Sequence, residues 1–131
     1  MRVRDPDTPP RLLLVDDDES ILLSLPAVLA SSGIEVFTAS NLEEALEMLK
    51  DRDVDVVLTD VRLRGKADID GLDLLTWVKD HRPDTRVVVM TGYGTEEIRE
   101  AAIERGAEDY LEKSIPMPEL VRRLRGLTPN R

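Results

Sequence analysis

Short apolar runs alternate along the chain with segments in which apolar residues recur every three or four positions. Val and Leu dominate the runs at 12–15, 54–59 and 87–90. Continuous runs of this kind are typical of strands that are covered on both faces of a parallel sheet. Two weaker runs, at 34–39 and 109–111, complete a set of five predicted strands.

Each predicted strand is followed by a segment with helical spacing. The apolar stripes of these segments lie in 21–33, 42–49, 72–78, 98–102 and 119–125. Asp18 is the expected N-cap of the first helix, and Thr95 that of the fourth. Ser40 and Glu43 match a capping box before the second helix. Gly106 fits the position just past the end of the fourth helix.

Five alternating strand and helix units predict an α/β fold, with a doubly wound five-stranded parallel sheet and helices on both faces. The common order for such a flavodoxin-like (βα)5 sheet is 2-1-3-4-5. We expect one domain over 11–127. It is preceded by a proline-containing, disordered N-terminal arm at 1–10 and followed by a short C-terminal tail at 128–131.

Composition narrows the possible functions of this 131-residue chain. It has no cysteine and one histidine, which excludes disulfides, thiolate zinc sites and any site that needs two histidines from this chain. The net charge of −9 argues against nucleic acid as a direct partner. The longest uncharged stretch, 20–34, is too short to span a bilayer, and 1–10 lacks the apolar region of a secretory signal. We therefore expect a cytoplasmic protein that contacts neither nucleic acid nor membrane.

Carboxylates gather where this fold places its ligands. Asp16, Asp17 and Asp18 follow the first strand, and Asp60 follows the apolar run of the third. In a 2-1-3-4-5 sheet these two strands are neighbours, and ligands bind outside their carboxyl ends. Adjacent carboxylates repel one another, and a cluster with only oxygen ligands suits Mg²⁺. The sequence therefore predicts a magnesium site, with Asp18 as a helix cap beside it.

Two further polar residues follow the neighbouring strands. Thr91 comes after the fourth strand and Lys113 after the fifth, so both side chains can reach the same edge of the sheet. A metal ion, a free carboxylate, a hydroxyl and an ammonium group supply what phosphoryl transfer to an aspartate requires. The cation charges neutralise the transferred group while the carboxylate attacks in line.

These residues lie in motifs that strongly resemble the receiver domains of two-component response regulators. The matching segments are 13–18 (LLVDDD), 57–60 (VLTD), 90–94 (MTGYG) and 106–113 (GAEDYLEK), and the similarity covers 11–127. The resemblance implies a signalling domain rather than an enzyme. Its phosphoryl donor would be the phosphohistidine of a sensor kinase.

The resemblance also implies a role for each residue of the site. The implied Mg²⁺ ligands are Asp16, Asp17, Asp60 and the backbone carbonyl of Arg62. Asp60 is also the implied phosphoacceptor, and Thr91 and Lys113 contact the phosphoryl group. Tyr110 is implied to be an aromatic switch that turns inward when Thr91 moves.

The chain departs from the usual pattern of the family at three points. The loop after Asp60 reads Leu-Arg-Gly at 63–65 in place of Met-Pro and is lengthened around 66–68, which predicts unusual kinase docking or metal access. Ser114 follows Lys113 where proline and a cis peptide are common, so we expect a trans bond or an altered loop there. Gly92 stands where alanine is common.

The resemblance carries two further expectations. Arg62 and Tyr93 stand at the positions that flank the path of hydrolytic water in this family, and their bulk predicts slow autodephosphorylation. The last two helices are the expected output surface, through which the chain would dimerise or bind an output partner or domain.

Two alternatives stay open at this point. Asp16 to Asp18 also resemble the Asp-x-Asp motif of haloacid-dehalogenase-type phosphatases, in which Asp16 would be the nucleophile and Asp18 the acid or base. The second alternative is a receiver-like adaptor that binds partners without phosphorylation. The identity of the phosphorylated aspartate distinguishes these possibilities.

Overall fold

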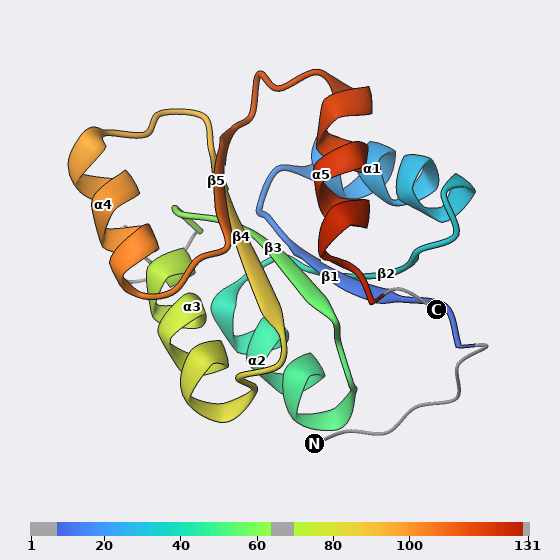
Figure 1. Cartoon of the computed structure of the whole chain (residues 1–131), viewed down its shortest axis with the longest axis horizontal. Coiled ribbons are helices and arrows are strands. Elements are labelled where there is room, and N and C mark those ends of the chain that lie inside the picture. Colours follow the sequence, from blue (N-terminus) through green and yellow to red (C-terminus); the bar gives the residue numbers. More distant parts are fainter. Residues whose placement is uncertain (1–7, 64–69, 130–131) are drawn as a thin grey trace.

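The computed structural model describes residues 8–63 and 70–129, in which the strands form one parallel sheet (Figure 1). The strands are β1 Arg11–Val15, β2 Glu35–Ala39, β3 Val56–Asp60, β4 Arg86–Thr91 and β5 Asp109–Glu112. Their order is β2-β1-β3-β4-β5, with every neighbouring pair parallel. The predicted fold class and strand order are confirmed. Most of the expected arm at 1–10, the end of the tail and the lengthened part of the loop lie outside the described residues.

Five helices cover the two faces of the sheet. They are α1 Glu19–Ser31, α2 Leu42–Asp51, α3 Asp70–His81, α4 Glu96–Glu104 and α5 Met117–Leu127. One buried cluster joins the sheet to α2, α3 and α4, and a second joins it to α1 and α5. Figure 1 shows the same division into layers. Side chains of β1, β3 and β4 alternate between the two clusters, which explains why these strands read as nearly continuous apolar runs.

Three of the four expected helix caps are confirmed, and one was wrong. The Asp18 carboxylate accepts from the backbone N–H of Ser20, Thr95 caps α4, and Gly106 takes a φ of +103° after it. The N-cap of α2, however, is Asn41, whose side chain accepts from the N–H of Glu44 at 2.9 Å. The hydrogen bonds predicted for Ser40 and Glu43 are thus displaced by one residue, since the side-chain oxygen of Asn41 accepts from the N–H of Glu44.

Strand register brings the acidic residues together. In the β1–β3 pair, Leu14 lies beside Leu58 and Val15 beside Thr59, so the residues that follow both strands emerge at the same edge. Within the described ranges no helix has the length and apolar character needed to cross a membrane.

Candidate functional site

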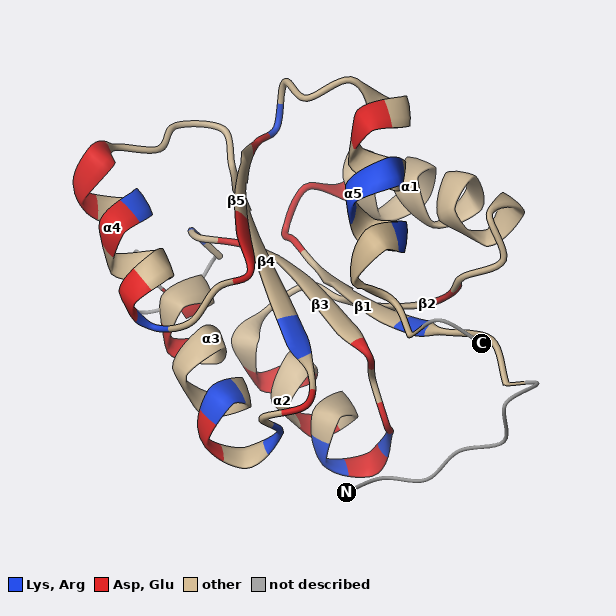
Figure 2. Cartoon of the chain, viewed as in Figure 1, with Lys and Arg blue, Asp and Glu red and all other residues tan. Residues whose placement is uncertain are grey.

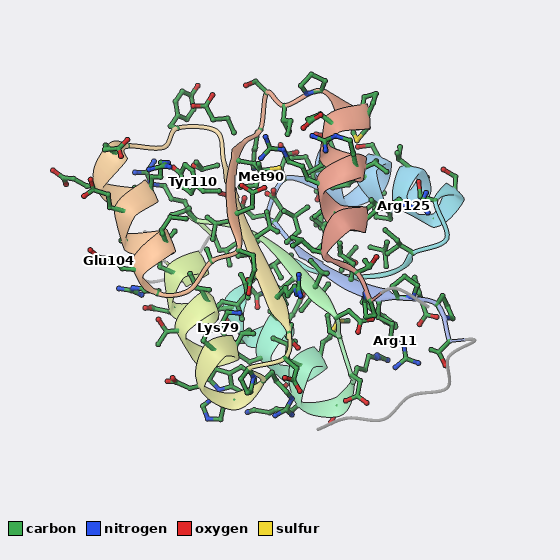
Figure 3. The ribbon with its side chains drawn as sticks, viewed as in Figure 1. Arg11, Lys79, Met90, Glu104, Tyr110 and Arg125 are labelled. Atoms are coloured by element: carbon green, nitrogen blue, oxygen red, sulfur yellow. The ribbon has the colours of Figure 1, made fainter. Side chains whose placement is uncertain are left out.

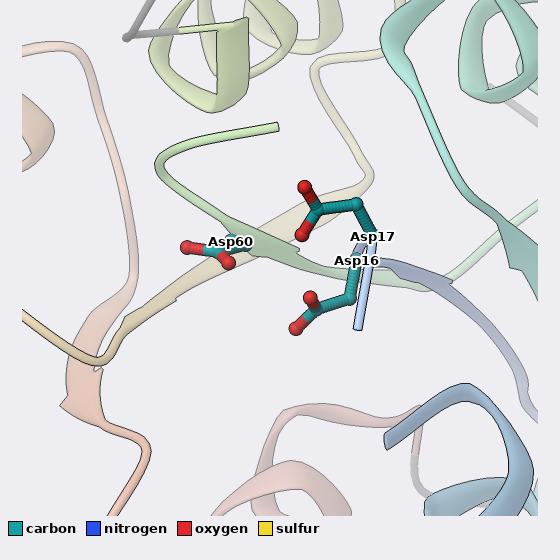
Figure 4. Close-up of side chains that lie close together, drawn as sticks. All are labelled: Asp16, Asp17 and Asp60. Carbon is teal, nitrogen blue, oxygen red and sulfur yellow. The ribbon is translucent and has the colours of Figure 1, made fainter. Parts of the chain in front are cut away.

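Three carboxylates converge at the carboxyl edge of the sheet, as Figure 4 shows. Asp16 and Asp17 lie in the loop between β1 and α1, which appears red in Figure 2, and Asp60 is the last residue of β3. One oxygen from each carboxylate lies within 4.8 Å of the others. The structure therefore brings together the three side chains that the sequence assigned to a metal.

Asp16 is the most enclosed of these acids, since its side chain is entirely buried. Its Oδ1 accepts from the backbone N–H of Asp18 at 2.9 Å and from Lys113 Nζ at 3.2 Å. Its Oδ2 lies 2.9 Å from the same Nζ but receives no aligned hydrogen bond from the described residues. Burial raises the pKa of Asp16; Lys113 opposes this shift, and the charge of Asp60 adds to it.

Lys113 bridges two of the acids from the end of β5. Its Nζ lies 2.8 Å from Asp60 Oδ2 and within ion-pair distance of Asp16. Burial acts to lower the pKa of Lys113, but the hydrogen bonds to Asp60 and Asp16 outweigh it, and the pKa lies above its ordinary value. The peptide bond to Ser114 is trans, as expected from the missing proline. The lysine reaches the site without the cis peptide.

Asp60 presents its two oxygens to different partners. Oδ2 faces Lys113, whereas Oδ1 accepts from the backbone N–H of Arg62 at 3.2 Å. Thr91, the last residue of β4, is buried beside them, and its hydroxyl oxygen accepts from the N–H of Tyr93 at 3.2 Å. Its hydroxyl proton is thus available to an acceptor at this edge.

The donor set fits a magnesium ion. All three side chains offer carboxylate oxygens, the ligands that Mg²⁺ prefers, and Asp16 Oδ2 is a buried acceptor without an aligned donor among the described residues. A divalent cation would relieve the repulsion between Asp16 and Asp60. Ligation by the carbonyl of Arg62 stays a prediction.

The side chain of Arg62 connects the two loops that follow β3 and β4. Its Nη1 donates to the backbone carbonyl of Tyr93 at 3.2 Å, which links the loop after β3 to the loop after β4. Sequence reasoning placed both residues beside the path of water but did not foresee this contact. The ring of Tyr93 itself projects into solvent and is 85% exposed.

Sequence reasoning gave no role to two glycines that contact site residues. A β-carbon on Gly71, at the start of α3, would overlap the carbonyl oxygen of Asp60 and lie 2.8 Å from Cα of Val61. A β-carbon on Gly94 would overlap the hydroxyl of Tyr110. Neither glycine has a left-handed φ, so space rather than backbone conformation requires them. The only available signal for Gly94 was its place in the motif segment 90–94, and Gly71 lies in none of the motif segments.

Tyr110 is oriented inward in this structure. It lies on β5 on the α4 side of the sheet (Figure 3), and its hydroxyl is buried without a hydrogen-bond partner in the described part of the chain. Burial raises the pKa of its phenol, with the charge of Glu112 adding to the effect. Its movement with Thr91 stays a prediction.

Comparison with known proteins identifies the family. The family model of the response regulator receiver domain matches residues 12–125. The transcriptional regulatory protein PrrA of Mycobacterium tuberculosis is 36% identical over 124 residues, which make up 95% of this chain and 52% of PrrA. The chain thus spans about half the length of this relative, and 23% of an NtrX-like response regulator of Rickettsia felis.

Solved structures of receiver domains are also similar to this chain. A CheY-like receiver domain protein from Methanospirillum hungatei superposes with a TM-score of 0.84 at 28% identity, covering 91% of this chain and 93% of that one. The beryllofluoride-activated NtrC4 receiver domain dimer gives a TM-score of 0.81 at 34% identity, with 89% and 94% covered. With the acidic cluster, Thr91 and Lys113 in place, this chain belongs to the response regulator receiver domains of two-component systems.

Proposed function

We propose that this receiver domain accepts a phosphoryl group on Asp60 from the phosphohistidine of a sensor kinase, in a Mg²⁺-dependent reaction. The observation that carries the proposal is the position of the Asp60 carboxylate, which Lys113 Nζ approaches to 2.8 Å beside two further acids that could hold a metal ion. Asp60 keeps 9% of its side chain exposed, whereas the Asp16 side chain is fully enclosed. Of these two acids, Asp60 is therefore the one that a donor can reach, which favours Asp60 over Asp16 as the phosphoacceptor.

The transfer forms a bond from a carboxylate oxygen of Asp60 to phosphorus and breaks the bond from phosphorus to the imidazole nitrogen of the donor. The donor imidazole, which carries a proton on its other ring nitrogen, leaves as the neutral ring with the bonding electron pair. Lys113 holds positive charge beside the attacking carboxylate, and the hydroxyl of Thr91 can donate to a phosphoryl oxygen. Asp16, Asp17 and Asp60 would hold Mg²⁺, which when bound supplies further positive charge to the transferred group.

A protein donor must cover the edge of the sheet at which α1 begins. This helix starts directly after Asp18, and 20–34 carries no charged side chain, so α1 has no blue or red turn beyond its start in Figure 2. Leu23 on its outer face is 79% exposed. An apolar partner surface fits this face, and we assign it to the kinase.

We place the output surface of the domain on its last two helices, α4 and α5. The NtrC4 receiver domain is a dimer when activated by beryllofluoride, which supports dimerisation of this chain on phosphorylation. The exposed Ile103 on α4 and the charged groups of α5 offer contacts for a second copy or an output domain. Sedimentation with and without beryllofluoride tests the dimer, and an unchanged profile would contradict it.

Intact mass after incubation with Mg²⁺ and acetyl phosphate tests the phosphoacceptor. We expect one phosphoryl adduct on the wild type, none on Asp60→Asn, and an unchanged adduct on Asp80→Asn, an exposed aspartate of α3. Asp16→Asn should reduce the rate through weaker Mg²⁺ binding. An adduct that persists in Asp60→Asn and vanishes in Asp16→Asn would overturn the proposal in favour of a phosphatase-like nucleophile.

A further inference from the structure

The loop between β4 and α4 contains a niche that only glycine leaves open. A β-carbon on Gly94 would overlap the hydroxyl oxygen of Tyr110, and it would lie 3.0 Å from the Cζ atom of the ring and 2.8 Å from Cγ2 of Thr91. The φ angle of Gly94 is not left-handed, so the backbone itself accepts other residues. The absence of a side chain at Gly94 is what makes room for the inward ring.

The ring in this niche is held by packing and not by a polar partner. Tyr110 packs against the buried cluster under α2, α3 and α4, and its hydroxyl finds no hydrogen bond within the described ranges. A buried hydroxyl without a partner favours any conformation in which water can reach it. The inward position therefore depends on a close steric fit and is opposed by the solvation of the phenol.

Thr91 forms a wall of the same niche. Its methyl group lies close to the space that a Gly94 side chain would occupy, while its hydroxyl accepts from the N–H of Tyr93. A change in the position of Thr91 thus changes the shape of the hollow that receives the ring. Gly94 therefore lies next to both Thr91, which belongs to the site, and the ring of Tyr110.

We propose that Gly94 determines whether Tyr110 can occupy its inward position, and that it thereby sets the response of the ring to the occupancy of the site. The first claim, that Gly94 leaves room for the inward ring, rests on the contacts of Gly94 alone. The coupling to site occupancy rests on the proposed phosphorylation of Asp60. When a side chain is added at Gly94, the cheapest relaxation is rotation of the ring into solvent, because the hydroxyl is the far end of a mobile side chain.

Fluorine NMR of 3-fluorotyrosine reports the position of the ring. The chain has two tyrosines, so Tyr93→Phe leaves Tyr110 as the single labelled residue. In this background we expect Gly94→Ala to shift the Tyr110 resonance, to increase its broadening by a soluble paramagnetic reagent severalfold, and to lower the titration midpoint of the phenol. Gly92→Ala is the matched control, since its β-carbon would meet only Cδ of Lys113, at 3.9 Å.

Mg²⁺ with beryllofluoride as a phosphoryl mimic tests the coupling. We expect it to narrow or shift the Tyr110 resonance in the parent protein and in Gly92→Ala but not in Gly94→Ala. The mass assay with acetyl phosphate reports separately whether Asp60 is modified. A parent protein that is not phosphorylated would count against the proposed function, whereas the steric effect of Gly94 on Tyr110 is tested by the NMR comparison of Gly94→Ala with the parent. A Tyr110 resonance that is identical in Gly94→Ala and in the parent would overturn the inference.

A double variant keeps the inference testable if Gly94→Ala folds poorly. If the ring causes the clash, Tyr110→Ala in the same chain removes it, and the two substitutions together cost less stability than the sum of the single ones. Urea unfolding followed by circular dichroism measures this coupling. Additive losses would show that the methyl group added at Gly94 clashes elsewhere and would refute the role of the ring.

Discussion

Lys113 offsets part of the negative charge of the acidic cluster, and its replacement by methionine is the most direct test of this effect. The substitution keeps a long apolar side chain but removes the ammonium group that lies 2.8 Å from Asp60 and 2.9 Å from Asp16. Removing one partner of a buried ion pair costs about 3–5 kcal/mol. The 21% exposure of the lysine side chain favours the lower end of this range.

Protonation of one aspartate sets an upper limit to the loss of stability in Lys113→Met. The folded variant can place a proton on the carboxyl pair, which at pH 7 costs about 4 kcal/mol for an acid of unperturbed pKa about 3.9. At pH 5 the same proton costs about 1.5 kcal/mol. We therefore expect Lys113→Met to lose about 3–4 kcal/mol relative to wild type at pH 7 and about half of that or less at pH 5.

The direction of the pH dependence of stability follows from proton linkage. With the lysine gone, the carboxyl pair has a folded-state pKa above that of the unfolded chain, so the folded state binds more protons between the two values. Stability is then lost as the pH rises from about 4, until the folded-state pKa has been passed. The same direction already holds for Asp16 in the wild type, whose pKa is raised by burial.

Urea unfolding at pH 5 and pH 7, with and without Mg²⁺, measures these losses. Lys79→Met is the matched control, because Lys79 (labelled in Figure 3) has a similar side-chain exposure of 22% but pairs with the more accessible Glu108. It should cost about 1 kcal/mol or less, with little dependence on Mg²⁺. Mg²⁺ should stabilise Lys113→Met more than wild type. A loss that is equal at both pH values and insensitive to Mg²⁺ would refute this account of the cluster.

Four further predictions concern the same edge of the sheet. Arg62→Ala should speed the decay of the phosphoryl adduct severalfold, measured by intact mass, since the guanidinium no longer links the two loops; an unchanged decay would contradict it. Gly71→Ala should cost about 1–3 kcal/mol in urea unfolding, because its β-carbon overlaps the backbone of Asp60, and should slow adduct formation; a neutral effect would show that the loop yields freely. Leu23→Lys should slow transfer from the cognate phosphorylated kinase but not from acetyl phosphate, and equal slowing would place the defect in the site. Burial raises the pKa of Asp16, so the affinity for Mg²⁺ should begin to fall at a higher pH than it would if Asp16 had the pKa of an ordinary aspartate. Measurement of the Mg²⁺ affinity as a function of pH checks this, and an affinity that stays constant down to about pH 4 would contradict it.

The fold could be predicted from the sequence because the strands have a clear apolar pattern. The runs of Val and Leu are buried on both faces, and their alternation with helical segments leaves one common sheet order. Once β1 and β3 are neighbours, Asp16 and Asp60 must emerge at the same edge. The acidic cluster was therefore predictable from the sequence, because strand order and direction alone bring its members to one edge.

The unforeseen contacts join segments that are distant in the sequence, and they depend on packing that has no local signal. The link from Arg62 to Tyr93 joins residues 31 positions apart, and the niche for Tyr110 is shaped by a glycine of another loop. The misplaced cap of α2 is a local error of a different kind. Ser40 and Glu43 satisfy the motif, but the backbone turns so that Asn41 and Glu44 make the bonds.

Lys113 shows how a site can tolerate a changed sequence around it. Serine follows the lysine and the peptide is trans, yet Nζ contacts both acids. The backbone is fixed on either side of this residue, because the N–H of Lys113 donates to the carbonyl of Thr91 at 2.9 Å and the N–H of Ile115 donates to that of Glu112 at 3.0 Å. Strand pairing thus places the Cα of the lysine, and the carboxylates attract the end of its flexible stem. The position of the ammonium group therefore depends on the pairing of β4 with β5 and on the two acids.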